Sequence, residues 1–113
     1  MTLTIDIAQV IGTPNAIIQK FGLQVFQETS KAIHSGQKVL IDFSNLKNVT
    51  TGFFHAAIGN LVKEYGATFY DLVELKGIDK AEWKEKLEDA INIASNPKKG
   101  LEIDQAISEL YAS

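Results

Sequence analysis

The sequence feature that most constrains the fold is a short apolar run, Val39-Leu40-Ile41-Asp42-Phe43, that lies between two helical patterns. The run is nearly continuous and rich in β-branched residues, which is typical of a strand buried on both faces. Apolar residues recur at spacings of three and four both before it and after it. Because a buried strand between two amphipathic helices is the repeating unit of such folds, the sequence predicts an α/β protein.

The first helical pattern predicts a helix of about five turns with one apolar face. We expect Thr13 to cap it, Pro14 to be its first residue and Gly36 to end it. Gly22, inside the pattern, predicts close packing against a neighbour. The residues expected on the apolar face are Ile17, Ile18, Phe21, Val25, Thr29, Ala32 and Ile33.

The remaining patterns complete an alternation of strands and helices. Strands are expected at Thr2–Ala8, where polar and apolar residues alternate, and at Phe69–Leu75. Helices are expected from about Gly52 to Tyr65, from a cap at Asp79 with Glu82 as its capping-box partner to Asn96, and near Leu101–Tyr111. We therefore predict one domain over residues 1–113, with a mixed or largely parallel sheet of about 3–4 strands packed with about 4 helices. Val39–Phe43 is its expected central strand.

Composition excludes several classes of function. Of the 113 residues, 45% are hydrophobic and none is cysteine, which favours an ordinary globular fold without disulfides or thiolate chemistry. No apolar run approaches the roughly 20 residues that span a bilayer, so no membrane partner and a cytoplasmic location are expected. All 11 basic residues are lysine and the net charge is −3, which argues against nucleic-acid binding.

Motifs for catalysis are missing from the sequence. It contains no phosphate-binding glycine loop, no nucleophile elbow and no paired histidines for a metal, and its two histidines, His34 and His55, fall on different expected elements. The carboxylates after residue 80 interleave with lysines, as on a solvated helix face. We therefore expect a non-enzymatic protein without a cofactor or a metal.

Two polar features lie around the central strand. Asp42 either contributes to a ligand site at the strand's carboxyl end or accepts hydrogen bonds that hold the Ser44–Asn48 loop. Thr50-Thr51-Gly52 stands at the start of the second helix, where a threonine caps the helix and where free amides also favour an anion. The residues alone leave both alternatives open.

An ordered set of segments resembles a known family. These segments are Val39-Leu40-Ile41-Asp42-Phe43-Ser44, Val49-Thr50-Thr51, Phe53 and Ala57-Ile58-Gly59-Asn60-Leu61. They resemble the STAS-like family of bacterial domains, which is related to the sulfate-transporter and anti-sigma-factor-antagonist domains. The resemblance covers roughly residues 16 to 97 and implies a small STAS-like domain.

The resemblance also implies a regulatory site. In antagonists of this type a serine at the helix N-terminus is phosphorylated by an ATPase of the histidine-kinase class. Counted from the strand aspartate this position falls on Thr51, and counted from the following glycine it falls on Thr50; the loop length favours Thr51. The implied function is a regulatory protein–protein interaction module, gated by threonine phosphorylation, whose partner is a histidine-kinase-type ATPase or an anti-sigma factor.

The alternative function is a small-ligand domain that binds an anion or a nucleotide at the same strand-end loop. Phe53 and Phe54 bear on the choice, because adjacent residues do not share one helical stripe, so either one stays at the surface or the second packs under a neighbouring helix. The candidate contact residues for a partner or ligand are Asp42, Ser44, Asn48, Thr50, Thr51, Phe53, Phe54 and His55.

Overall fold

A computed structural model describes residues 2–95 of the chain. The helix expected at Leu101–Tyr111 lies outside these residues. The elements follow one another as β1 (Thr2–Asp6), α1 (Ile7–Ile11), β2 (Asn15–Ala16), α2 (Gln19–His34), β3 (Lys38–Asp42), β4 (Asn48–Val49), α3 (Thr51–Phe54), the π-helix η1 (His55–Gly59), α4 (Asn60–Tyr65), the 3-10 helix η2 (Gly66–Thr68), α5 (Phe69–Leu72), β5 (Val73–Lys76) and α6 (Ala81–Ser95).

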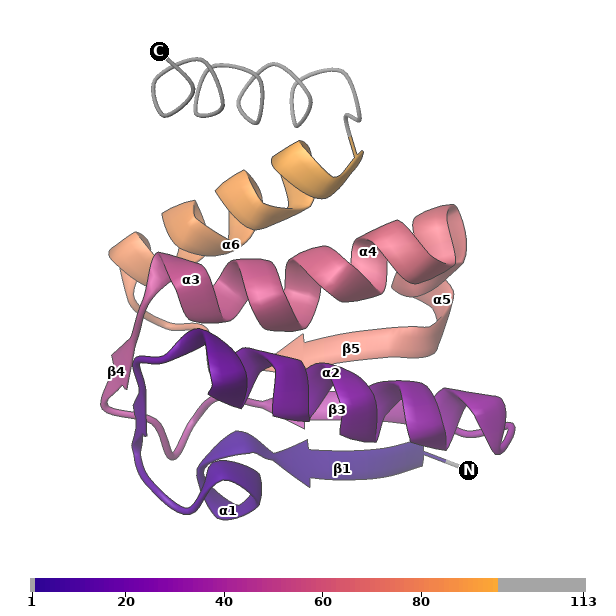
Figure 1. Ribbon diagram of the computed structural model, residues 1–113, viewed down its shortest axis with the longest axis horizontal. Coiled ribbons are helices and arrows are strands. Elements are labelled where there is room, and N and C mark those ends of the chain that lie inside the picture. Colours follow the sequence, from indigo (N-terminus) through magenta and orange to yellow (C-terminus); the bar gives the residue numbers. More distant parts are fainter. Residues whose placement is uncertain (1, 96–113) are drawn as a thin grey trace, which may run out of the picture.

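The main sheet has three parallel strands in the order β1-β3-β5. Ile41 pairs in register with Ile5 on one side and with Leu75 on the other, so the predicted central position of this strand is confirmed. All three arrows point to the side where β4 and the first turns of α2, α3 and α6 lie (Figure 1). This carboxyl edge of the sheet therefore gathers the loops that precede the helices.

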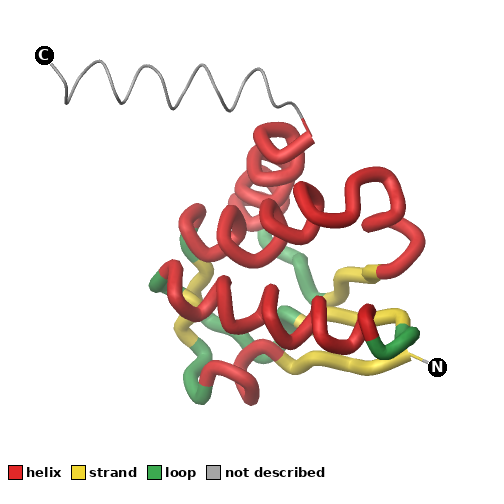
Figure 2. Tube along the Cα trace, turned by 45° about the vertical axis from the view of Figure 1, so that its right-hand side comes forward, coloured by secondary structure: helices red, strands yellow, loops and turns green. Residues whose placement is uncertain are grey.

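The helices pack on one face of the sheet. The strand order advances in one direction, and right-handed crossovers then place both connecting helices on the same face. Val39 and Ile41 are buried on that face, whereas Lys38 and Glu74 on the other face are exposed. Beyond these helices α6 forms an outer layer, packed on η1 (Figure 2). The described part is thus a sheet with one layer of helices and α6 outside it.

Gly22 of α2 allows the two central helices to approach each other closely, as its position in the pattern predicts. A Cβ built there would lie 2.7 Å from the Phe53 carbonyl oxygen and 2.7 Å from the Ala56 Cβ. Both distances are shorter than van der Waals contact, so only glycine fits. This contact fixes the first turns of the helix that begins at Thr51 against α2.

Several expected boundaries are wrong, the first of them at the start of the first long helix. The helix expected from Pro14 begins at Gln19, because residues 15 and 16 instead pair with β4 as the short strand β2. Ile17 and Ile18, expected on the buried helix face, are consequently exposed.

The other boundary errors follow from local helices. The strand expected from Phe69 begins only at Val73, since residues 69–72 form α5. The strand expected to reach Ala8 ends at Asp6, which caps α1 by accepting a bond from the Gln9 amide. The last described helix begins at Ala81 and the Lys80 carbonyl accepts its first hydrogen bonds, so Lys80 holds the cap position expected for Asp79.

Candidate functional site

Thr50 caps the helix that begins at the carboxyl edge of the sheet. Its backbone is extended, with φ −96° and ψ 161°, and its Oγ1 accepts a hydrogen bond of 3.2 Å from the Phe53 amide. Its carbonyl accepts a bond of 3.2 Å from the Phe54 amide. The side chain of this half-buried threonine therefore satisfies an amide that a helix start would otherwise leave without a partner.

Thr51 stands next to this cap but has a different environment. It is the first residue of α3, and its side chain is exposed. From Thr51 the helical backbone continues through η1 to Tyr65. The two hydroxyls that the sequence leaves equivalent are thus distinct in the structure, because one holds the helix start and the other faces solvent.

Asp42 holds the loop that follows the central strand. Its Oδ1 accepts bonds from the Ser44 amide at 2.9 Å and from the Ser44 hydroxyl at 2.6 Å. These two hydrogen bonds lower the pKa of Asp42, and the nearby Lys76 charge adds to the effect. The Asn45 side chain donates to Asp6 Oδ2 at 2.7 Å, which ties the same loop to β1. Of the two alternatives for Asp42, the loop-holding role matches these bonds.

Gly77 explains how the chain after β5 passes this loop. Its φ of +84° lies in the left-handed region, and a Cβ at this position would overlap the backbone of Ser44. The Phe43 amide donates to the Lys76 carbonyl at 2.8 Å just before this contact. The loop after β3 is therefore held from both neighbouring strands.

Asn48 connects the next part of the loop to the segment before α2. Its side-chain amide donates to Asn15 Oδ1 at 2.7 Å, and the two residues are register partners in β2 and β4. Next to the pair Ala16 and Val49, the Thr50 amide donates to the Ala16 carbonyl at 3.1 Å. These bonds place residues 15–18 beside the threonine pair.

Two lysines complete the site, Lys80 just before α6 and Lys86 within it. Neither was predicted from the sequence as part of the site. The Lys80 ammonium donates to the Lys47 carbonyl at 3.2 Å, and the Lys86 ammonium donates to the Val49 carbonyl at 3.0 Å. Lys80 also lies over the Trp83 ring, 4.8 Å from its centre. Their alternation with carboxylates predicts only a solvated helix face. Periodicity gives no sign of which loop a helix end covers.

The family comparison covers this arrangement. A family model described as a STAS-like domain of unknown function (DUF4325) matches residues 22–83, which include most of α2, the central strand, the loop and the helix from Thr51. The chain belongs to this family. Comparisons with curated proteins and with solved structures find no significant match. The STAS-like fold expected from the sequence is thereby confirmed, and the family description itself assigns no activity.

Two contact residues proposed for this STAS-like domain are corrected by the structure. Phe53 and Phe54 are both fully buried, so neither is available to a partner at the surface. The Phe54 ring stacks on Phe43 with centroids 5.4 Å apart, and the Phe53 ring meets Phe43 edge-on at 6.4 Å. Two adjacent aromatic side chains are buried together because α2 and α6 pack against this helix and the Phe43 ring contacts both of them.

His55 follows them at the start of η1 and is half-buried. The π-helical turn widens the backbone there, and the Asn60 side chain donates to the Ala56 carbonyl at 2.7 Å. In residues 2–95 no group of three His, Asp or Glu side chains is arranged to hold a metal ion. Within the same residues no helix combines the length and the apolar character needed to cross a bilayer.

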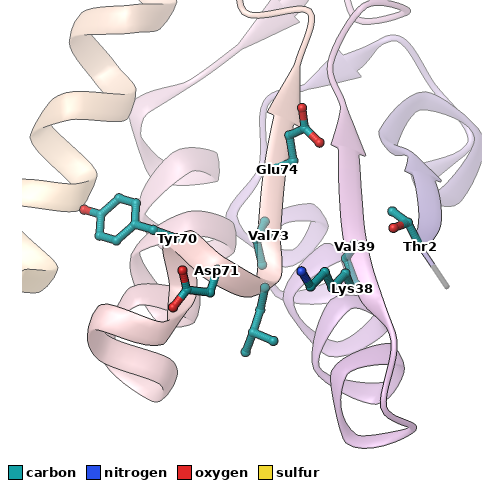
Figure 3. A pocket seen from close by; sticks show the side chains of 8 residues that line it. Thr2, Lys38, Val39, Tyr70, Asp71, Val73 and Glu74 are labelled. Carbon is teal, nitrogen blue, oxygen red and sulfur yellow. The ribbon is translucent and has the colours of Figure 1, made fainter.

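A hollow of about 250 Å³ lies far from the threonine pair, at the amino edge of the sheet. Figure 3 shows Lys38 extending from β3 toward β5, with Tyr70 and Asp71 on the α5 side. None of its lining residues is one of the candidate contact residues. This hollow therefore gives no support to a ligand site at the strand-end loop.

Proposed function

We propose that this STAS-like domain is a non-enzymatic regulatory module that binds a protein partner at the carboxyl edge of its sheet. The contact surface consists of the loop 44–51 and the exposed Gly52 that follows it in α3. The observation that carries the proposal is the division of labour between the two threonines: Thr50 caps the helix and Thr51 is exposed. A change at Thr51 therefore alters the surface without removing the helix cap.

Phosphorylation of Thr51 is the proposed switch. A phosphate adds a charge of about −1.5 to −2 at neutral pH. At the first position of a helix that charge is compatible with the fold, because the helix dipole and its free amides favour an anion there. The same charge opposes an acidic or an apolar partner surface. The modification thus changes binding and leaves the domain folded.

The proposed partner is a histidine-kinase-type ATPase or an anti-sigma factor in a bacterial cytoplasm. This assignment comes from the resemblance to anti-sigma-factor antagonists. The small-ligand alternative is less well supported, since the polar groups of Asp42 and Asn48 are engaged in hydrogen bonds that hold the loop. A loop whose polar groups are already hydrogen-bonded, with an exposed hydroxyl beside it, is better suited to contact a protein surface than to enclose a small ligand.

The test is a pulldown from native lysate with wild type, Thr51→Ala and Thr51→Glu, read by mass spectrometry of the bound proteins and of the bait. We expect wild type and Thr51→Ala to retain the same ATPase or sigma-linked partner and Thr51→Glu to lose it. Thr4→Glu is the matched control, because Thr4 is also exposed but lies on β1. Equal retention by all four proteins would contradict the proposal.

A further inference from the structure

Exposed aliphatic side chains are concentrated at the start of α2. Five large hydrophobic residues of the described part are exposed, and three of them, Ile17, Ile18 and Leu23, fall within seven consecutive positions, with exposed fractions of 52%, 45% and 41%. Clustered exposure of this kind marks an interaction site more often than scattered single residues do. We call Ile17, Ile18, Lys20 and Leu23 the α2-start surface.

The α2-start surface lies beside the threonine pair. Ala16 pairs in register with Val49, so the residues that follow each of them run side by side. The same two segments meet again at Gly22, where a Cβ would lie 2.7 Å from the Phe53 carbonyl oxygen of α3. The α2-start surface therefore borders the surface proposed above for partner binding, although Ile17 and Ile18 were expected in the core.

The stretches of chain that form and border the α2-start surface contain lysines but no acidic residue. No acidic residue occurs between Asp6 and Glu28 or between Asp42 and Glu64, although the whole chain carries a net charge of −3. The exposed lysines of these two segments are Lys20, Lys47 and Lys63, and Lys63 lies in α4. The ammonium groups of Lys80 and Lys86 reach the loop between them. The nearest acidic residues after this loop belong to another part of the chain, the approach to α6 and its first turns, and they are Asp79, Glu82 and Glu85. The stretches without acidic residues are those that hold the start of α2 and the loop.

We infer that the α2-start surface binds a partner segment that carries acidic side chains next to an aliphatic or aromatic one. The inference rests on the proposed function and names the chemistry of its partner. Ile17, Ile18 and Leu23 would cover the apolar side chain, and Lys20 and Lys47 would face the carboxylates. Such a partner also explains why a phosphate on Thr51 would release it, because the phosphate adds negative charge beside the same lysines.

The test is selection of peptides from a random displayed library on the purified full-length chain. The enriched peptides are synthesised, and their affinity is measured by fluorescence anisotropy at low salt and at about 0.5 M NaCl. We expect acidic peptides with at least one large apolar residue, and weaker binding at high salt. No enrichment, or enrichment of neutral or basic peptides, would overturn the inference.

Matched variants locate the binding site. We expect Leu23→Glu and Lys20→Glu each to weaken peptide binding about tenfold or more. Leu3→Glu and Lys38→Glu are the controls, since Leu3 has almost the same exposure as Leu23, 42%, and both controls lie away from the α2-start surface. Circular dichroism checks that each variant is folded. If Leu23→Glu does not fold, Lys20→Glu still tests the inference, because it only reverses a charge at an exposed position.

Other occupants give distinguishable results. Self-association that Leu23→Glu abolishes in sedimentation would assign the surface to a second copy of this chain and overturn the inference. Binding to anionic lipid vesicles in place of acidic peptides would overturn it as well. If acidic peptides bind at Leu23 but Thr51→Glu leaves their affinity unchanged, the inference on the partner's chemistry stands and the phosphorylation switch proposed above fails.

Discussion

The two edges of the parallel sheet differ in how they are built. At the carboxyl edge the loop after β3 is held by Asp42, Asn48 and two lysines, and the stretches 7–27 and 43–63 contain no acidic residue. At the amino edge Asp71 and Glu74 line an open hollow together with Lys38. The carboxyl edge therefore has a loop held by hydrogen bonds with lysines around it, whereas the amino edge has an open hollow lined by charges of both signs. This difference favours the carboxyl edge for the partner binding proposed above.

The largest expected effect tests the close contact that builds this edge. Gly22→Ala places a methyl group against the Phe53 carbonyl and Ala56, so we expect a loss of about 1–3 kcal/mol in the free energy of unfolding. Urea denaturation measures the loss.

Gly52→Ala is the matched control for this change. A Cβ there meets no atom closer than the Thr50 Oγ1 at 4.0 Å, so we expect unchanged or slightly greater stability. Equal stability of Gly22→Ala and wild type would show that the two helices are not held at the distance described here.

The next effect separates the two threonines. Thr50→Ala removes the oxygen that accepts the Phe53 amide, and we expect it to cost about 1 kcal/mol. Thr51→Ala removes only an exposed hydroxyl, and we expect a change within about 0.5 kcal/mol. Thermal and urea denaturation of both variants give the comparison. A greater loss for Thr51→Ala than for Thr50→Ala would reverse the assigned roles.

The smallest effect concerns the pH dependence of the loop. Hydrogen bonds from Ser44 lower the pKa of Asp42 from its ordinary value of 3.8, so this carboxylate stabilises the fold above that value and the stabilisation is lost as pH falls through the lowered pKa. We expect Asp42→Asn to be less stable than wild type at neutral pH, with the difference shrinking in acid. Urea denaturation at several pH values measures it. A constant difference at all pH values would exclude this titration as its cause.

The sequence predicts well those elements whose apolar or glycine pattern follows directly from how they are buried. The apolar run from Val39 is central and parallel, and Gly22 is a point of close packing, because both follow from burial on several sides. The start of the first long helix was wrong because Pro14 and Thr13 are good local start signals, and pairing of Asn15 with Asn48 overrides them. Such long-range pairing leaves no local signature.

The candidate site was predictable only in part. The position of the loop and the importance of Thr50 and Thr51 follow from a strand, a polar loop and a helix in order. The burial of Phe53 and Phe54 depends on helices that lie far along the chain, so helical periodicity alone left open whether both would be buried. The lysines of the site were missed for the same reason, since α6 reaches the loop across 33 and 37 residues of sequence.

The proposed switch at Thr51 is tested by the affinity of one partner for two forms of this domain. Protein carrying phosphothreonine at position 51 is made by semisynthesis and compared with unmodified protein by calorimetry, using the partner retained by wild type in the pulldown. We expect the phosphorylated form to stay folded and to bind about tenfold more weakly or not at all. Equal affinity of the two forms would contradict it.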